Sequence, residues 1–270
     1  MRKYLLSIVC LLFLLCSCGE YTKILKSADI DEKYEYAQVY YNQGKYTRAI
    51  TLLEDVVPMY RGTEDAENAL YLLAMSHFKM KDYLSAGEYF LRYCNNYPRG
   101  EKAMESRFNL AYGDFIDSPD ARLDQDITQK AIKELDSFVE MYPRSELADS
   151  ATIMRYQLVD KLCYKEYLSA KLYLNLGTYM GNNYEAAVIT ARNAQRDYPY
   201  TKYREDLGYI IFKARYEAAE FSIDEKKEDR LREAYDEYYT FSNEFPDGKY
   251  AKEVARMYEK ISKELTKYEE

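Results

Sequence analysis

The chain has 270 residues, a formal net charge of −8 and a hydrophobic fraction of 47%. An acidic chain without a cluster of Lys and Arg offers little to a phosphate backbone, which argues against nucleic acid as a partner. Only 10 Gly and 6 Pro accompany 16% aromatic residues, so the composition is that of a folded chain and not of a disordered one.

The first seventeen residues are predicted to be an export signal. Two basic residues precede an apolar run from Leu5 to Leu15, which is too short to cross a bilayer as a permanent helix. Leu15-Cys16-Ser17-Cys18 resembles a bacterial lipobox, in which cleavage leaves the second cysteine at the new N-terminus to receive a diacylglycerol. We therefore expect a signal peptide over 1–17, lipidation of Cys18 and a tether over 18–29. An ordinary secretory signal that contains cysteines is the alternative.

Two further cysteines, Cys94 and Cys163, lie far apart on stretches that are expected to be helical. In such a setting, thiols are more often buried as small hydrophobic side chains than joined in a disulfide. The sequence therefore predicts two free thiols.

An alanine recurs along the chain with a proline twelve residues later, and each such proline follows an aromatic residue. The residues between them have the spacing of an amphipathic helix. The small alanine lets a neighbouring helix approach, and the proline ends its own helix. A tight turn and a second helical stretch precede each alanine, so the unit is helix, turn, helix. The pairs are Ala86 and Pro98, Ala131 and Pro143, Ala187 and Pro199, and Ala234 and Pro246, with Ala49 and Arg61 as a fifth pair that lacks the proline.

This unit resembles a tetratricopeptide repeat of about 34 residues. Residues 30–61 and 67–98 follow the pattern closely, and a last helix over about 249–267 is predicted to cap the stack. The predicted fold is all-α: one solenoid over 30–267 with about five helix-turn-helix repeats and a C-terminal capping helix. The third repeat is expected at about 101–143 with an insertion near Ser118-Pro119-Asp120. The fourth is expected to have a long first helix over about 146–180, before Tyr184 and Ala187. The fifth is expected at about 203–246 with a polar insertion from Asp224 to Asp229.

Few residues have the patterns of catalytic or metal sites. His77 is the one histidine of the chain, and no Gly-rich phosphate loop, CxxC or HExxH occurs. A metal site or a catalytic triad based on histidine therefore has too few residues, and His77 is expected to pack within its repeat. We expect no enzymatic activity, no catalytic residues, no cofactor and no metal.

The candidate binding residues lie on the first helix of each of the first three repeats. By analogy with known tetratricopeptide repeats, these positions line a concave groove. Aromatic side chains there would give contact area to an extended peptide, while amides and a lysine would hold its backbone or carboxylate. The alternative is that they pack between repeats. The candidates are Tyr34, Gln38, Tyr41 and Asn42, then Asn68, Tyr71, Met75, Phe78 and Lys79, and finally Phe108, Tyr112 and Phe115.

The lipobox, the repeats and the mature length together resemble the BamD family of outer-membrane assembly lipoproteins. Tyr-Pro-Arg-Gly/Ser-Glu at 97–101 and 142–146 is similar to the family's repeat ends, as is the stretch 155–162. The resemblance implies a lipid-anchored protein of the outer membrane that faces the periplasm and helps to fold and insert β-barrel proteins. Its C-terminal half would bind the barrel-forming subunit of that machinery (BamA-like), and its N-terminal repeats would bind unfolded outer-membrane proteins.

One departure concerns Ile189-Thr190, which stands where Asn-Arg is expected in better-known members. No partner-binding residue is therefore assigned to that helix. Two other functions are compatible with a lipoprotein built from such repeats. One is a glycan-binding lipoprotein of the SusD type, against which the chain length and the absence of Trp argue; the other is a scaffold of the cell envelope.

Overall fold

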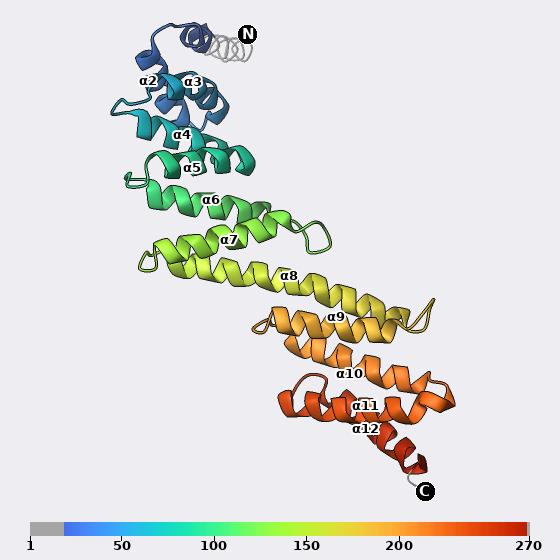
Figure 1. The fold of residues 1–270 in the computed structure, drawn as a ribbon. Helices are drawn as coiled ribbons and strands as arrows, with labels where there is room; N and C mark the ends of the chain where they lie inside the picture. The colour runs from blue at the N-terminus through green and yellow to red at the C-terminus, as the bar shows by residue number, and fades with distance from the viewer. Residues whose placement is uncertain (1–18, 269–270) are drawn as a thin grey trace, which may run out of the picture. The chain divides into compact units, whose positions relative to one another are not determined.

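The computed structural model describes residues 19–268, so the predicted signal peptide and Cys18 lie outside the described residues. Residues 19–268 form helices and no strand (Figure 1), which confirms the predicted all-α fold. The helices are α2 Ile30–Asn42, α3 Tyr46–Met59, α4 Ala66–Lys79, α5 Tyr83–Asn96, α6 Ala103–Asp117, α7 Asp126–Met141, α8 Ala148–Leu176, α9 Asn183–Asp197, α10 Arg204–Glu220, α11 Asp224–Glu244 and α12 Ala251–Leu265, followed by the 3-10 turn η1 Thr266–Tyr268.

The contacts within the chain group it into two compact units, whereas the sequence predicted one solenoid over 30–267. Among the described residues, unit 1 comprises 19–118 and 126–155, and unit 2 comprises 119–125 and 156–268. Within unit 1, α2 packs on α3, α4 on α5 and α6 on α7, as helical hairpins of the predicted kind. Within unit 2, α10 packs on both α9 and α11, and α12 covers the end of that stack.

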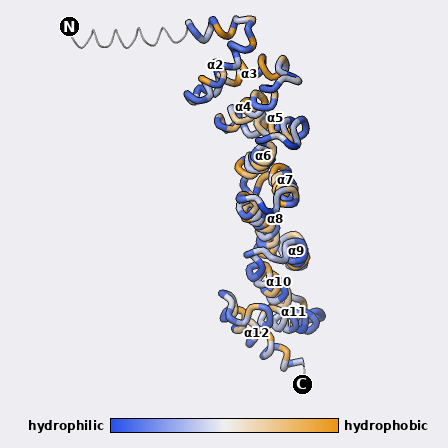
Figure 2. Tube along the Cα trace, turned by 90° about the vertical axis from the view of Figure 1, so that its left-hand side faces the viewer, coloured by the Kyte–Doolittle hydropathy of each residue, from blue (hydrophilic) through white to orange (hydrophobic). Residues whose placement is uncertain are grey.

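The repeated alanines lie where their helices meet a neighbour. Ala49, Ala86, Ala131, Ala187 and Ala234 are all buried, as the spacing predicted. Hydrophilic and hydrophobic residues are mixed along the helices (Figure 2), and in α7 and α12 the hydrophobic residues recur on one face, as in an amphipathic helix that packs on a core. The small side chains at the contacts therefore allow close packing, while the large apolar residues fill the core on either side.

The helices that precede the prolines of the alanine–proline pairs end in one common conformation. Tyr97, Tyr198 and Phe245 have φ between −128° and −130° and ψ between 60° and 64°. The N–H of each donates to the carbonyl four residues earlier, at 2.8 to 2.9 Å. The proline that follows has no N–H, and its ring restricts the residue before it, so the helix cannot continue. The prolines thus end the helices where the sequence predicted.

The segment expected to be a tether is helical and packed. Residues 19–25 are helical, and Ile24 is only 2% exposed within the core formed by α2 to α4. The ring of Tyr21 meets that of Tyr40 edge-on at 5.6 Å, and the guanidinium of Arg48 lies 4.9 Å from the Tyr21 ring. The apolar and aromatic side chains of this segment therefore hold it against the first repeat.

The two predicted insertions differ in structure. Residues 118–125 form an irregular loop, in which the Gln125 amide donates to the carbonyls of Asp120 and Leu123 at 2.8 and 3.1 Å. Residues 224–229, expected to be a polar insertion, are instead the first turns of α11. Acidic residues favour the first turn of a helix, and this explains why a polar stretch is helical here.

Three further observations concern the cysteines, His77 and the length of the helices. Cys94 and Cys163 are free thiols. His77 stacks on Tyr89 at 5.3 Å, and its Nδ1 lies 2.9 Å from a carboxylate oxygen of Asp82, so it packs at the turn between α4 and α5. None of the helices in residues 19–268 has the length and apolar character needed to cross a membrane.

Candidate functional site

Unit 1 brings six of the candidate residues together as partly exposed aromatic side chains, which we call the aromatic row. The Tyr112 ring of α6 lies 6.1 Å from the ring of Phe78 of α4. It also lies 5.8 Å from Phe108 and 6.3 Å from Phe115, with the ring planes nearly parallel. Tyr41, Tyr71 and Phe78 pack against one core cluster around Phe90. The aromatic row consists of Tyr41, Tyr71, Phe78, Phe108, Tyr112 and Phe115.

Tyr34 and Met75 were candidates for the groove, but both belong to the core. Tyr34 is 5% exposed and Met75 is 9% exposed. The Tyr34 ring packs against Tyr60, the residue that follows α3, at 5.1 Å, and the Asn109 amide donates to the Met75 sulfur at 3.5 Å. For these two residues the alternative interpretation, packing between helices, is the one that the structure supports.

The amide candidates Gln38 and Asn68 lie beside the hydroxyl of Tyr34, where burial raises the pKa of that phenol and the two amides lower it in part. Gln38 is partly exposed and Asn68 is exposed, so both side chains reach the surface of unit 1. Asn42 and Lys79 are exposed at the ends of α2 and α4, and no contact found in residues 19–268 ties them to the row.

The charged groups beside the aromatic row come from the start of α6. The Lys102 ammonium lies 5.9 Å from the Tyr71 ring centroid and 3.8 Å from a carboxylate oxygen of Glu105. Burial raises the pKa of Tyr71 above its ordinary value, and Glu105 beside the hydroxyl raises it further. Sequence reasoning chose Lys79 and missed Lys102, because Lys102 lies before α6 and approaches Tyr71 only through tertiary packing.

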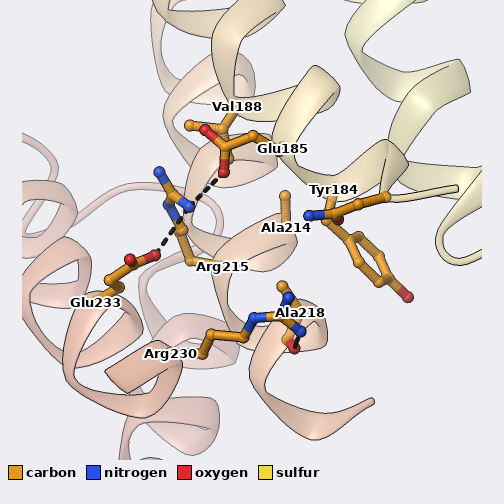
Figure 3. Close-up of a pocket in the computed structure, with 9 residues that line it drawn as sticks. Tyr184, Glu185, Val188, Ala214, Arg215, Ala218, Arg230 and Glu233 are labelled. Carbon is orange, nitrogen blue, oxygen red and sulfur yellow. Dashed lines mark hydrogen bonds and ion pairs between the residues drawn. The ribbon is translucent and has the colours of Figure 1, made fainter. Parts of the chain in front are cut away.

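Unit 2 contains a pocket of about 210 Å³ between α9, α10 and α11 (Figure 3). Arg215 stands between two carboxylates, 2.6 Å from Glu185 and 2.9 Å from Glu233. Arg230 donates to the Ala218 carbonyl at 3.2 Å, at the C-terminal end of α10. Arg215 joins three helices through its two carboxylates, whereas Arg230 bonds to neutral oxygen atoms, and the charges of the two arginines and two glutamates sum to zero.

No group of three or more His, Cys, Asp or Glu side chains in residues 19–268 is arranged to hold a metal ion. The described chain offers instead aromatic faces, amides and the partly exposed Lys102 ammonium, which lies 3.5 Å from Glu101 and 3.8 Å from Glu105. Such a surface suits contact with another polypeptide.

The chain is similar to known proteins along most of its length. The sequence profile of the YfiO family, described as outer membrane lipoprotein, matches residues 26–220. Outer membrane protein assembly factor BamD of Neisseria meningitidis serogroup B (strain MC58) is 26% identical over 277 residues, which cover 95% of this chain and 96% of that protein. The putative outer membrane protein assembly factor BamD of Aquifex aeolicus is 29% identical over 210 residues, covering 75% and 65%. Because the profile spans well over half of its residues, this chain belongs to the YfiO family of outer membrane lipoproteins.

Proposed function

We propose that this protein is a subunit of the machinery that assembles β-barrel proteins in the outer membrane. It is anchored by a lipid on Cys18, faces the periplasm and binds unfolded outer-membrane proteins on unit 1. Its C-terminal half binds the barrel-forming, BamA-like subunit. The family and the names of its relatives support the general role, and the aromatic row is the observation that supports substrate binding.

The aromatic row fits the end of a β-barrel chain. The last strand of such a chain typically carries a terminal aromatic residue, whose ring would pack among Tyr71, Phe78 and Tyr112. The free carboxylate would then approach Lys102, whose ammonium lies over the Tyr71 ring, 5.9 Å from its centroid. This contact is exposed, so it weakens as salt rises.

Truncating the rings themselves is a poor test of this binding. Tyr71 and Phe78 lie 6.3 and 6.1 Å from the core ring of Phe90, so changing either to alanine is expected to lower stability as well as affinity. Lys102 and Lys79 avoid this problem, because both side chains reach solvent. They form a matched pair of lysines, one beside the row and one away from it.

The experiment measures the affinity of residues 19–270 for a peptide from the last strand of an outer-membrane barrel, with a free C-terminal phenylalanine. Lys102→Gln is expected to weaken binding by about fivefold or more, the loss of one partly exposed charge contact, whereas Lys79→Gln changes it by less than about twofold. The amidated peptide should bind the two variants equally. Equal losses in both variants, or no peptide binding at all, would refute substrate binding at the aromatic row.

The partner proposal has a separate test. The lipidated protein, purified from its own membranes by an affinity tag, is expected to retain a large β-barrel protein. A purification in which no β-barrel protein is retained would contradict the proposed place in the assembly machinery.

A further inference from the structure

A second pocket of unit 2, of about 350 Å³, lies between the end of α8 and α10. Its wall consists of residues 174–178, Tyr184, Lys213, Glu217 and Phe221. These residues come from the turn between α8 and α9 and from the C-terminal part of α10. The pocket is therefore built by two neighbouring repeats, and it shares Tyr184 with the pocket around Arg215.

The carboxylate of Glu217 forms no ion pair among the described residues, although the Lys213 ammonium on the same pocket wall acts on it at longer range. Burial raises the pKa of Glu217, and Lys213 and the Tyr184 hydroxyl only partly offset that shift. Lys213 lines the same pocket, but its ammonium donates to the Tyr209 hydroxyl at 3.1 Å. No ion pair among the described residues involves Glu217. A half-buried carboxylate without a salt bridge favours a positively charged ligand.

The backbone of the pocket carries negative partial charge as well. Residues 174–178 include the last residues of α8, whose terminal carbonyls form the negative end of the helix dipole. Asn183 already donates to the Gly177 and Tyr179 carbonyls, at 3.1 and 2.7 Å. The carbonyl end of α8 therefore favours a cation, as the Glu217 carboxylate does, whereas the Lys213 ammonium on the pocket wall acts in the opposite sense.

Two aromatic rings in the wall are parallel to each other. The Tyr184 and Phe221 rings have centroids 6.5 Å apart and planes within 4°. Phe221 is 67% exposed, so a flat face of the pocket is open to solvent. Aromatic faces attract cations, and a planar guanidinium can stack on a ring while it pairs with a carboxylate.

Large apolar side chains are also exposed in the two turns that contribute residues to the pocket wall. Tyr179 and Ile223 are mostly exposed, and Met180 is 90% exposed. The backbone of Met180 has a φ of 55°, a left-handed conformation that side chains rarely adopt. Exposed apolar residues on two adjacent turns are typical of a protein contact surface.

We infer that the pocket of Glu217 and Phe221 binds an arginine side chain of a partner polypeptide. The guanidinium stacks on Phe221 and pairs with Glu217, while apolar residues that flank the arginine in the partner contact Tyr179, Met180 and Ile223. A lysine fits less well, because a compact and strongly hydrated ammonium gains less from an aromatic face. This inference rests on unit 2 alone and does not depend on substrate binding by unit 1.

The first test compares three peptides with residues 19–270. Each is an acetylated and amidated pentapeptide of leucines with one central residue: arginine, lysine or citrulline. Citrulline has nearly the shape of arginine but no charge. We expect the arginine peptide to bind about tenfold or more tightly than the citrulline peptide, with the lysine peptide between them. Equal binding of arginine and citrulline would overturn the inference.

The second test changes the pocket. Glu217→Gln keeps the side-chain shape and a polar group beside Tyr184, and Phe221 is exposed, so neither Glu217→Gln nor Phe221→Ala should alter the fold. Binding of the arginine peptide is expected to fall about tenfold in the first variant and about fivefold in the second. Glu225→Gln, at an exposed position in the first turn of α11, is the matched control and should bind as the unchanged protein does.

Lys102→Gln in unit 1 should leave the arginine peptide unaffected, so a failure here and a failure of the proposed function are distinguishable. Binding that survives Glu217→Gln, or that falls equally in Glu225→Gln, would show that the peptide is not held by this pocket.

Discussion

The hydroxyl of Tyr93 accepts a hydrogen bond of 3.1 Å from the backbone N–H of Lys102. The same hydroxyl donates to the carboxylate of Glu67, in the first turn of α4. A Cβ atom on Gly100 would lie 2.8 Å from the Tyr93 hydroxyl oxygen. The absence of a side chain at Gly100 therefore lets the turn between α5 and α6 approach this hydroxyl. One phenol thus joins α4, α5 and the residue before α6, and it fixes Lys102 beside the aromatic row.

Removing this hydroxyl should loosen that junction. Tyr93→Phe keeps the ring in the core but leaves the Lys102 N–H and Glu67 without their partner, which costs about 1–3 kcal/mol of unfolding free energy. Tyr97→Phe is the control, because no hydrogen bond of the described residues uses the Tyr97 hydroxyl. Urea denaturation gives the free energy of unfolding of both variants. Equal values for Tyr93→Phe and Tyr97→Phe would show that the Tyr93 hydroxyl does not stabilise the turn.

Enlarging a buried alanine tests the register of the repeats. Ala131 is fully buried on α7, whereas Lys133 is exposed on the same helix. Ala131→Phe should overpack the contact between helices and cost about 1–3 kcal/mol. The matched variant Lys133→Phe adds the same ring to the surface and should leave the melting temperature nearly unchanged. A melting temperature that does not fall in Ala131→Phe would place this alanine outside the core.

Asp114 should make stability depend on pH. It is 8% exposed, one carboxylate oxygen lies 3.1 Å from the Lys130 ammonium, and the other has no hydrogen-bond partner. Burial raises the pKa of Asp114 above 3.8, and Lys130 lowers it only in part; Asp117 adds a further increase. The folded state therefore binds the proton more tightly than the unfolded chain, and stability falls as pH rises from 3.8 through the folded-state pKa.

Asp114→Asn removes this ionisation. The variant is expected to be more stable than the unchanged protein by roughly 1 kcal/mol at neutral pH, where the buried charge is fully developed. The difference should shrink as pH falls below the raised pKa of Asp114, where both side chains are neutral. Thermal unfolding over a range of pH measures this difference in stability. A stability difference that grows as the pH falls would contradict a raised pKa for Asp114.

The proposed anchor is tested by Cys18→Ala. This variant should fractionate as a soluble protein or accumulate as the uncleaved precursor, because the thiol that receives the lipid is missing. Each buried methylene of an acyl chain contributes about 0.8 kcal/mol to membrane binding, so the loss of the chains is expected to be decisive. Retention of the variant in salt-washed membranes would show that another feature holds the protein there.

The sequence was sufficient to predict the parts of the fold that depend on local chemistry. The alanine and proline spacing predicted the positions of the helices, because a small side chain and a missing N–H affect the backbone and the packing at their own positions. It did not reveal that residues 19–25 pack on the first repeat, since Tyr21 and Ile24 read equally well as a linker. Nor did the sequence distinguish Tyr34, whose ring packs against Tyr60 after α3, from the partly exposed rings of the aromatic row.

The candidate site was predictable only in part for the same reason. The analogy with known repeats placed most of the aromatic row, because those positions recur in each first helix. Lys102 was missed, because its distance from Tyr71 is set by the turn after α5 and not by a periodic position. Glu217 was missed because a carboxylate on a helix reads as solvated until the structure shows what surrounds it.

The packing of Tyr21 against Tyr40 limits how far the protein can move from its membrane. Cys18 precedes Tyr21 by three residues, and residues 19 and 20 are already helical, so each adds only about 1.5 Å along the helix. A lipoprotein with a long flexible linker can search the space between two membranes, whereas a lipid on Cys18 would keep this first repeat close to the bilayer surface. Unfolded chains would then have to be delivered to the first repeat.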